Sequence, residues 1–124
     1  MNEKYVTSLE LSKRLRELGV PQRSEHYWWK TPGTKKYSIG TNNIGGICSA
    51  YLSDELLEWL PYQYHVWKSG CMENDLGDWV CCKFSEPEFE YFEPIVQADS
   101  SANALAEMLI FLLKNKIIQS KDLK

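Results

Sequence analysis

The stretch "LGVPQRSEHYWWK", Leu18 to Lys30, contains the change from helix to sheet that decides the fold. Gly19 can take the left-handed backbone conformation that commonly follows the last residue of a helix, and Pro21 prevents any continuation. The aromatic residues that follow favour extended backbone. The stretch therefore predicts the end of a helix, a short loop and the first strand of a sheet.

The two adjacent tryptophans lie on opposite faces of that predicted strand, because successive side chains of a strand point to opposite sides. Tyr27 and Trp29 share one face, and His26, Trp28 and Lys30 share the other. One tryptophan therefore belongs to the core. The other lies under a helix or at a surface that binds a partner.

The residues before this stretch carry the signals of an amphipathic helix. Thr7 and Glu10 have the spacing of a capping box, with Thr7 as the N-cap. Three leucines at positions i, i+4 and i+7 form one apolar stripe, and charged residues lie off it. We expect a helix over about residues 8–18.

The residues after it predict a hairpin and a second helix. "EHYWWK" and "YSIG" are β-prone and flank "TPGTKK", whose Pro-Gly pair marks a turn. The following "TNNIGG" predicts a loop. "SAYLSDELLEWLP" predicts a short helix with Ser53 as its N-cap and Pro61 as its end.

The second half of the chain predicts three more strands. "PYQYHVWKSG" alternates in polarity and "WVCCKF" is rich in residues that favour strands, so the two predict an antiparallel pair. "PIVQA" predicts a further strand.

"DSSANALAEMLIFLLKNKII" predicts the last helix, with Asp99, Ser100 or Ser101 as its N-cap. Its apolar residues cover a wider arc than one sheet face requires. Ile110 and Phe111 flank its narrow polar strip. Either neighbouring helices cover these flanks, or Ile110 and Phe111 meet a second subunit in a homo-oligomer.

Together these elements predict a single domain over residues 1–124. Their order is α-β-β-α-β-β-β-α, without the regular alternation of a parallel doubly wound sheet. We expect an α+β fold. It would hold a mostly antiparallel four- to five-stranded sheet, two main helices packed on it and one short helix.

The charge of the chain disfavours a general nucleic-acid binder. The net charge is −3 and the pI is about 5.4, whereas such binders are normally basic. The distribution is uneven, with a net charge of +4 over residues 1–36 and −7 over residues 37–124. A basic N-terminal part can still face an acidic partner.

The sequence also predicts the compartment. The N-terminus lacks the apolar region of a signal peptide. The longest apolar run, over residues 104–113, is too short to span a bilayer. We expect a cytoplasmic protein with no membrane partner and with reduced cysteines.

Three segments form a set: "YVTSLELSKRLRELGVPQRSEHYWWK", "SAYLSDELLEWLP" and "ADSSANALAEMLIFLLKNKII". Together they resemble small, uncharacterised phage and prophage proteins. The resemblance covers about half of the residues, which are spread over nearly the whole length of the chain. The resemblance implies a compact αβ sandwich-like fold and an origin in a mobile element. It implies no activity, cofactor or catalytic residue.

The N-terminal segment allows an alternative function. Residues 7–30 are similar to the opening of MerR-like winged-helix proteins, where "LGV" separates a support helix from a recognition helix. A recognition helix presents polar residues at helical spacing to base edges. Here it would carry only Arg23 and Lys30 as cations, beside aromatic residues that suit a strand better. The alternative is therefore a DNA-binding regulator with contacts at Arg23 and Lys30, and nucleic acid is disfavoured as a partner.

The four cysteines, Cys48, Cys71, Cys81 and Cys82, equal the number that a structural zinc site needs. Their spacing lacks the close pairs of zinc modules, and adjacent Cys81 and Cys82 would point to opposite faces of a strand. A catalytic cysteine would need a nearby base such as His65. "ENDLGD" lacks the spacing of a calcium loop. We therefore expect buried thiols, no metal, no cofactor and no catalysis.

The acidic stretch "SEPEFEYFEP" is the predicted partner surface. Its acidic and aromatic residues suit docking on a basic protein: Glu86, Glu88, Glu90, Tyr91 and Glu93. The alternative is an edge strand whose charges prevent edge-to-edge pairing. We expect a non-catalytic phage or prophage accessory protein that acts by binding a host or phage protein.

Overall fold

A computed structural model describes residues 5–41, 46–61, 64–68, 79–85 and 90–123. The elements follow one another in the order α1 (Leu9–Glu17), β1 (His26–Lys30), β2 (Tyr37–Gly40), β3 (Cys48–Ala50), α2 (Ser53–Leu57), β4 (Tyr64–Lys68), β5 (Trp79–Ser85), β6 (Glu90–Ala98), α3 (Ser101–Lys114) and the short 3₁₀ helix η2 (Ser120–Asp122).

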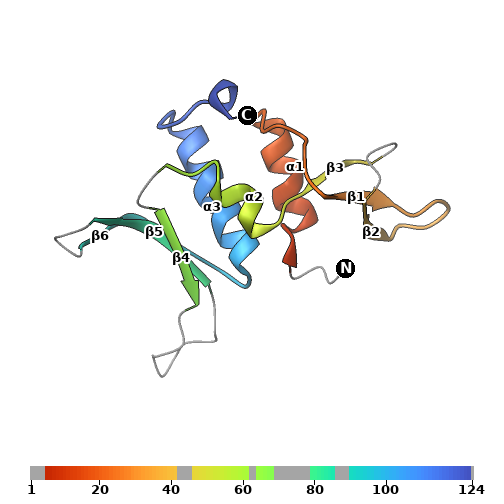
Figure 1. Cartoon of the computed structure of the whole chain (residues 1–124). Helices are drawn as coiled ribbons and strands as arrows, with labels where there is room; N and C mark the ends of the chain where they lie inside the picture. Colours follow the sequence, from red (N-terminus) through yellow and green to blue (C-terminus); the bar gives the residue numbers. More distant parts are fainter. Residues whose placement is uncertain (1–4, 42–45, 62–63, 69–78, 86–89, 124) are drawn as a thin grey trace.

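The strands form two separate three-stranded sheets, and the helices lie between them (Figure 1). The N-terminal sheet has the strand order β2-β1-β3, and the C-terminal sheet has the order β4-β5-β6. Every pairing is antiparallel. The predicted α+β class, the β1–β2 hairpin and the pairing of β4 with β5 are confirmed.

The prediction of one four- to five-stranded sheet is wrong. It missed β3, which is only three residues long and shows no periodicity that a sequence pattern could reveal. β3 pairs with β1 on the side opposite to β2, so β1 is the middle strand of a separate three-stranded sheet. The chain then passes through α2 before β4 starts the second sheet.

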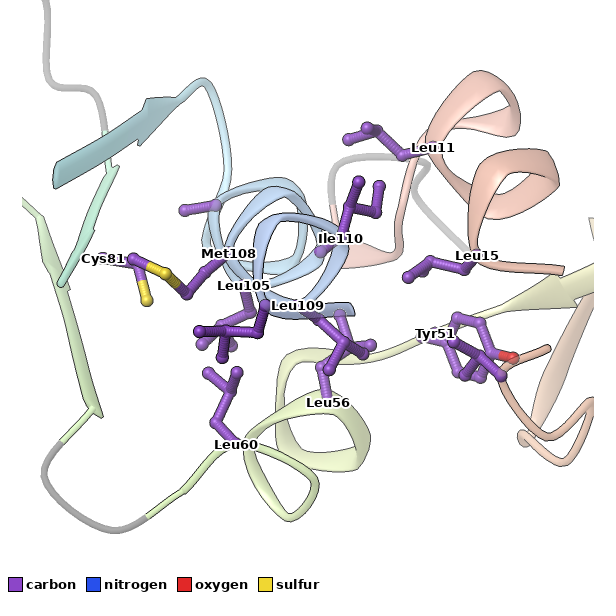
Figure 2. Packing of buried hydrophobic residues seen from close by; sticks show 14 of the residues in the cluster. Leu11, Leu15, Tyr51, Leu56, Leu60, Cys81, Leu105, Met108, Leu109 and Ile110 are labelled. Atoms are coloured by element: carbon purple, nitrogen blue, oxygen red, sulfur yellow. The ribbon is translucent and has the colours of Figure 1, made fainter. Parts of the chain in front are cut away.

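α3 is the central helix and contacts α1, α2 and all three strands of the C-terminal sheet. Its buried residues point in several directions and belong to the main core: Ala104, Leu105, Ala106, Met108, Leu109, Ile110 and Leu112. Figure 2 shows Met108 directed toward Cys81 of β5 and Ile110 on the side of Leu11 and Leu15 of α1. The wide apolar arc is therefore covered on more than one side within the chain.

This packing bears on the predicted oligomer interface at Ile110 and Phe111. Ile110 is 5% exposed and belongs to the main core. Phe111 is half-buried and packs against the same core. Contacts within the chain therefore cover most of Ile110, and Phe111 keeps the larger accessible part. The use of these two residues in a subunit interface stays a prediction.

α1 begins one residue later than the capping-box spacing indicates. Its N-cap is Ser8, whose hydroxyl accepts a hydrogen bond from the Leu11 N–H at 3.2 Å. The predicted N-cap Thr7 is instead buried, with its hydroxyl 2.6 Å from that of Ser12 and accepting from the Tyr51 N–H at 3.1 Å. Thr7 thus joins α1 to the segment after β3. The helix ends as predicted, with Gly19 at a φ of +87°.

The N-termini of the three helices are joined by polar side chains. The Ser8 N–H donates to Asn103 Oδ1 at 2.8 Å, which connects α1 to α3. Ser100 is the N-cap of α3, one of the three predicted alternatives. The N-cap of α2 is Leu52 rather than Ser53, and the Leu52 N–H donates to Glu55 Oε1 at 2.8 Å. The Ser53 hydroxyl lies 2.5 Å from that of Ser101 and so connects α2 to α3.

Glu107 on α3 provides a test of this packing by pH. Burial raises the pKa of its carboxyl above the ordinary value of 4.5, the Arg14 guanidinium opposes the shift, and Asp99 adds to it. Because a raised pKa in the folded state means that the charged form is disfavoured there, ionisation of Glu107 lowers stability as the pH rises through the raised pKa.

We expect Glu107→Gln to increase the free energy of unfolding at neutral pH. Near pH 3, well below the ordinary pKa, both side chains are neutral and the difference should vanish. Urea unfolding at the two pH values measures this, and a variant that is less stable than the wild type at neutral pH would contradict it.

Candidate functional site on the outer face of the N-terminal sheet

The register of β1 with its two neighbours decides which side chains share a face, because residues opposite each other in an antiparallel pair point to the same side. Trp28 lies opposite Ile39 and Cys48, and all three pack in a second, smaller core. Tyr37 is on the same face, where Lys13 Nζ of α1 lies 5.5 Å from its ring centroid. This inner face of the sheet is therefore directed toward α1.

The opposite face points away from α1. Tyr27 lies opposite Gly40 and Ser49, and Trp29 lies opposite Ser38. Ser49 is fully buried, and its N–H donates to Gln22 Oε1 in the loop before β1. The accessible remainder of this side, which we call the outer face, consists of Tyr27, Trp29, Ser38 and Gly40.

The two adjacent tryptophans differ in their hydrogen bonding. Trp28 is 5% exposed, and its indole N–H donates to the Thr7 carbonyl at 3.0 Å. Trp29 is only half-buried as a residue. Its indole nitrogen is nevertheless covered and has no hydrogen-bond acceptor in the described structure. An unpaired buried donor costs roughly 1–3 kcal/mol. Among the described residues of this sheet, His26 Nδ1 and Ser49 Oγ are also buried without a hydrogen-bond partner, and Trp29 Nε1 is the one of the three that belongs to the accessible outer face.

A hollow of about 310 Å³ lies beside Trp29. Small residues on β2 create it, since Ser38 and Gly40 place little side chain next to the indole. A Cβ atom at Gly40 would lie 3.3 Å from Trp29 Nε1 and 3.5 Å from Cδ1, so the ring rests directly on the glycine backbone. The hollow is lined by Trp29, Lys30, Thr31, Pro32, Ser38, Gly40 and Thr41.

A second hollow, of about 500 Å³, continues toward the hairpin turn and is lined by residues 30–35. It shares Lys30, Thr31 and Pro32 with the first, so the two hollows are neighbours along the hairpin, and we call them together the hairpin groove. The lining contains the cations Lys30 and Lys35 and no acidic residue. The groove is therefore electropositive next to an aromatic face.

Arg23 and Lys30, the predicted DNA contacts, are both exposed but do not lie on a helix. The segment that the regulator alternative takes as a recognition helix forms a loop and strand β1. Their side chains consequently lack the helical spacing that presents polar groups to the major groove. Lys30 is instead part of the hairpin groove.

The predicted acidic partner surface is described only in part. Glu86 and Glu88 lie outside the described residues. Glu90, Tyr91 and Glu93 are described by their backbone, which belongs to β6, an edge strand of the C-terminal sheet. Their use as a partner surface stays a prediction.

The described cysteines are poor nucleophiles. Cys48, Cys81 and Cys82 are free and buried, and burial raises the pKa of each thiol, that of Cys81 to about 12. His65 does lie opposite Cys82 in the β4–β5 register. A raised pKa keeps the thiol protonated near neutral pH, which opposes nucleophilic chemistry. Cys71 lies outside the described residues.

A metal centre has no support in the described part of the chain. No group of three or more His, Cys, Asp or Glu residues is gathered there that could hold a metal ion. Cys81 and Cys82, the closest pair in sequence, follow each other along β5, and Cys81 faces the main core. Successive strand residues point apart and cannot share one ion.

Sequence reasoning found half of the candidate site. The alternation in "HYWWK" identified the face shared by Tyr27 and Trp29, but it missed Ser38, Gly40 and the role of Lys35. The same alternation in "YSIG" would have found the small residues once the hairpin register was known. The register depends on the turn and cannot be read from the strand sequence itself.

Comparison with known protein families, with curated proteins and with solved structures found no match. In the described chain, no helix combines the length and the apolar character that crossing a membrane requires. The function therefore has to be argued from the residues of the outer face and the hairpin groove.

The two tryptophans should respond differently to the same substitution. Trp28→Phe removes the hydrogen bond to the Thr7 carbonyl in the second core and should lower the free energy of unfolding by roughly 1–3 kcal/mol. Trp29→Phe removes an unpaired donor and should cost no more than about 0.5 kcal/mol. Urea denaturation of both variants measures the difference. Equal destabilisation would show that the Trp29 indole N–H is satisfied in solution.

The thiols should be protected in the folded protein. Because their pKa values are raised, Cys48, Cys81 and Cys82 should react with iodoacetamide much more slowly in the native state than in urea. Mass spectrometry of the digested protein reports each cysteine separately, which keeps Cys71 apart. Fast alkylation of Cys81 or Cys82 in the native protein would contradict this prediction and would support a cysteine enzyme.

Proposed function

We propose that this protein is a non-catalytic accessory protein of the phage or prophage type, acting in the cytoplasm by binding another protein through its outer face. The observation that carries the proposal is the position of Trp29. It is a half-buried aromatic residue next to a hollow, on the side of the sheet directed away from α1, with an indole donor that lacks an acceptor.

The chemistry of the outer face supports binding to a protein. Tryptophan and tyrosine contribute most often to the energetic centres of interfaces, where they fill pockets and are surrounded by polar residues. Tyr27 and Trp29 would form such a centre, with Ser38 beside them and Lys35 at the hairpin turn. The protected thiols of the described cysteines argue in the same direction, because they favour binding over catalysis.

The DNA-binding regulator remains the second candidate that an experiment must separate. Its support is the exposure of Arg23 and Lys30 in a basic part of the chain. The strand geometry of β1 weighs against it, since the proposed recognition helix is not formed.

The test compares proteins retained by the immobilised wild type and by variants. We expect the wild type to retain one protein in a defined ratio, and Trp29→Ala to lose it, because truncation of a central aromatic residue commonly costs 2 kcal/mol or more. Leu57→Ala is the matched control, since Leu57 is also exposed, at 43%, but lies on α2. Binding should be reproduced with the purified partner. A wild type that retains no protein, or a Trp29→Ala variant that retains the same protein equally, would overturn the proposal.

Two further experiments test the acidic segment and DNA binding as alternatives to the outer face. Loss of the partner in the double variant Glu88→Lys with Glu90→Lys, but not in Trp29→Ala, would move the site to the acidic segment. A duplex DNA complex that weakens with salt and with Arg23→Ala would support the regulator instead.

A further inference from the structure

The hairpin groove has a consistent chemical character along its length. It starts at the aromatic outer face beside Trp29 and Gly40, and continues past Lys30 to the turn at Lys35. Its two hollows share three residues and contain two lysines without a carboxylate. Lys36, which follows directly, is exposed as well. A ligand in this groove therefore meets an apolar surface at one end and positive charge along the rest.

Charge complementarity defines the occupant. The groove lies in the part of the chain whose net charge is +4, while residues 37–124 have a net charge of −7. The chain as a whole is acidic, with a net charge of −3 and a pI of about 5.4, which disfavours a long polyanion such as DNA or RNA as the occupant. A short acidic peptide needs only the local cations of the hairpin, Lys35 and Lys36, which are both exposed. An extended chain rises roughly 3.3 Å per residue, so about six residues are enough to follow a hairpin of this size.

The unpaired indole N–H of Trp29 can donate a hydrogen bond to a ligand at the apolar end of the groove. Trp29 Nε1 is covered in the free protein by the backbone at Gly40. A small turn of the ring about its side-chain torsion would expose the N–H to an acceptor, and an extended peptide has backbone carbonyls that are not used internally. Formation of that hydrogen bond removes a cost that the free protein carries.

We propose that the hairpin groove binds an extended acidic segment of a partner protein, whose carboxylates meet Lys35 and Lys36 and one of whose backbone carbonyls accepts from Trp29 Nε1. This inference rests on the proposed function and adds the class of the partner segment. Its two parts have separate consequences: the lysines give the binding its dependence on salt and on acidic residues, and the indole gives it a dependence on a single N–H donor.

The experiment measures binding of fluorescent peptides of about six residues to the full chain by anisotropy, with acidic, neutral and basic peptides of otherwise equal composition. We expect the acidic peptides to bind more tightly than the neutral ones by at least tenfold at low salt, and the basic ones not to bind. The difference should shrink as salt is added, because screening weakens exposed charge pairs. Equal affinity for acidic and neutral peptides would overturn the proposal.

Charge-reversal variants locate the site. Lys35→Glu with Lys36→Glu should weaken the acidic peptide by tenfold or more. Lys116→Glu with Lys121→Glu is the matched control, because it changes the net charge equally at two exposed positions near the C-terminus. It should leave the affinity within about twofold if the hairpin is the site. Equal weakening by both pairs would show attraction to the whole protein rather than to the groove, and would overturn the proposal.

Substitutions at Trp29 test the indole donor. Trp29→Phe keeps an aromatic ring and should leave the free protein as stable as the wild type, yet weaken the acidic peptide several-fold. Gly40→Ala should weaken it as well, because the added Cβ lies 3.3 Å from Trp29 Nε1 and prevents the ring from turning. A Trp29→Phe variant that binds as tightly as the wild type would remove the indole from the site.

The failure of this inference is distinguishable from failure of the proposed function. If a partner protein is lost in Trp29→Ala but is insensitive to salt and to Lys35→Glu with Lys36→Glu, the outer face binds a protein whose contact segment is not acidic. Single-stranded DNA that displaces the acidic peptide and binds more tightly would overturn the proposal in favour of nucleic acid. A peptide of residues 85–94 of this chain could bind as tightly as the acidic peptides. If light scattering also showed self-association, the partner would be a second copy of this chain.

Discussion

The arrangement of the layers follows from the burial of α3. This helix carries apolar side chains over most of its circumference, and each of them stays in contact with water unless another element covers it. The C-terminal sheet covers one side, and α1 and α2 cover others. The N-terminal sheet packs through β3 on α1, one layer further from α3. That outlying position gives the sheet one face on a helix and one face directed away from it.

β1 places its side chains alternately on the buried face and on the accessible face of this sheet. As the middle strand it has neighbours on both edges, so its alternating side chains are held on two defined faces. Trp28 closes the second core, and its indole is anchored on the backbone of Thr7. Trp29, one residue later, has no such anchor and lies beside the small residues of β2. The same strand therefore stabilises the sheet with one tryptophan and leaves the other half-buried on the outer face.

The distribution of charge reinforces this division. The hairpin groove lies among cations, and Glu90 and Glu93 of the predicted acidic segment belong to β6, at the edge of the C-terminal sheet (Figure 1). Opposite charges on distant elements cannot neutralise one another within one molecule at physiological ionic strength, where the Debye length is about 8 Å. The lysines of the hairpin groove therefore keep their positive potential at the surface.

Local patterns in the sequence were sufficient for the elements that depend on neighbours along the chain. Alternation identified β1 and the opposite faces of Trp28 and Trp29, and the Pro-Gly pair identified the hairpin. Only the tertiary structure decided the contacts between distant segments: the three-residue strand β3, the division into two sheets, and the use of Thr7 to hold Tyr51 instead of capping α1. The physical reason is that a strand of three residues and a buried hydroxyl gain their stability from partners far away in sequence. The residues next to β3 and Thr7 along the chain give no information about those distant partners.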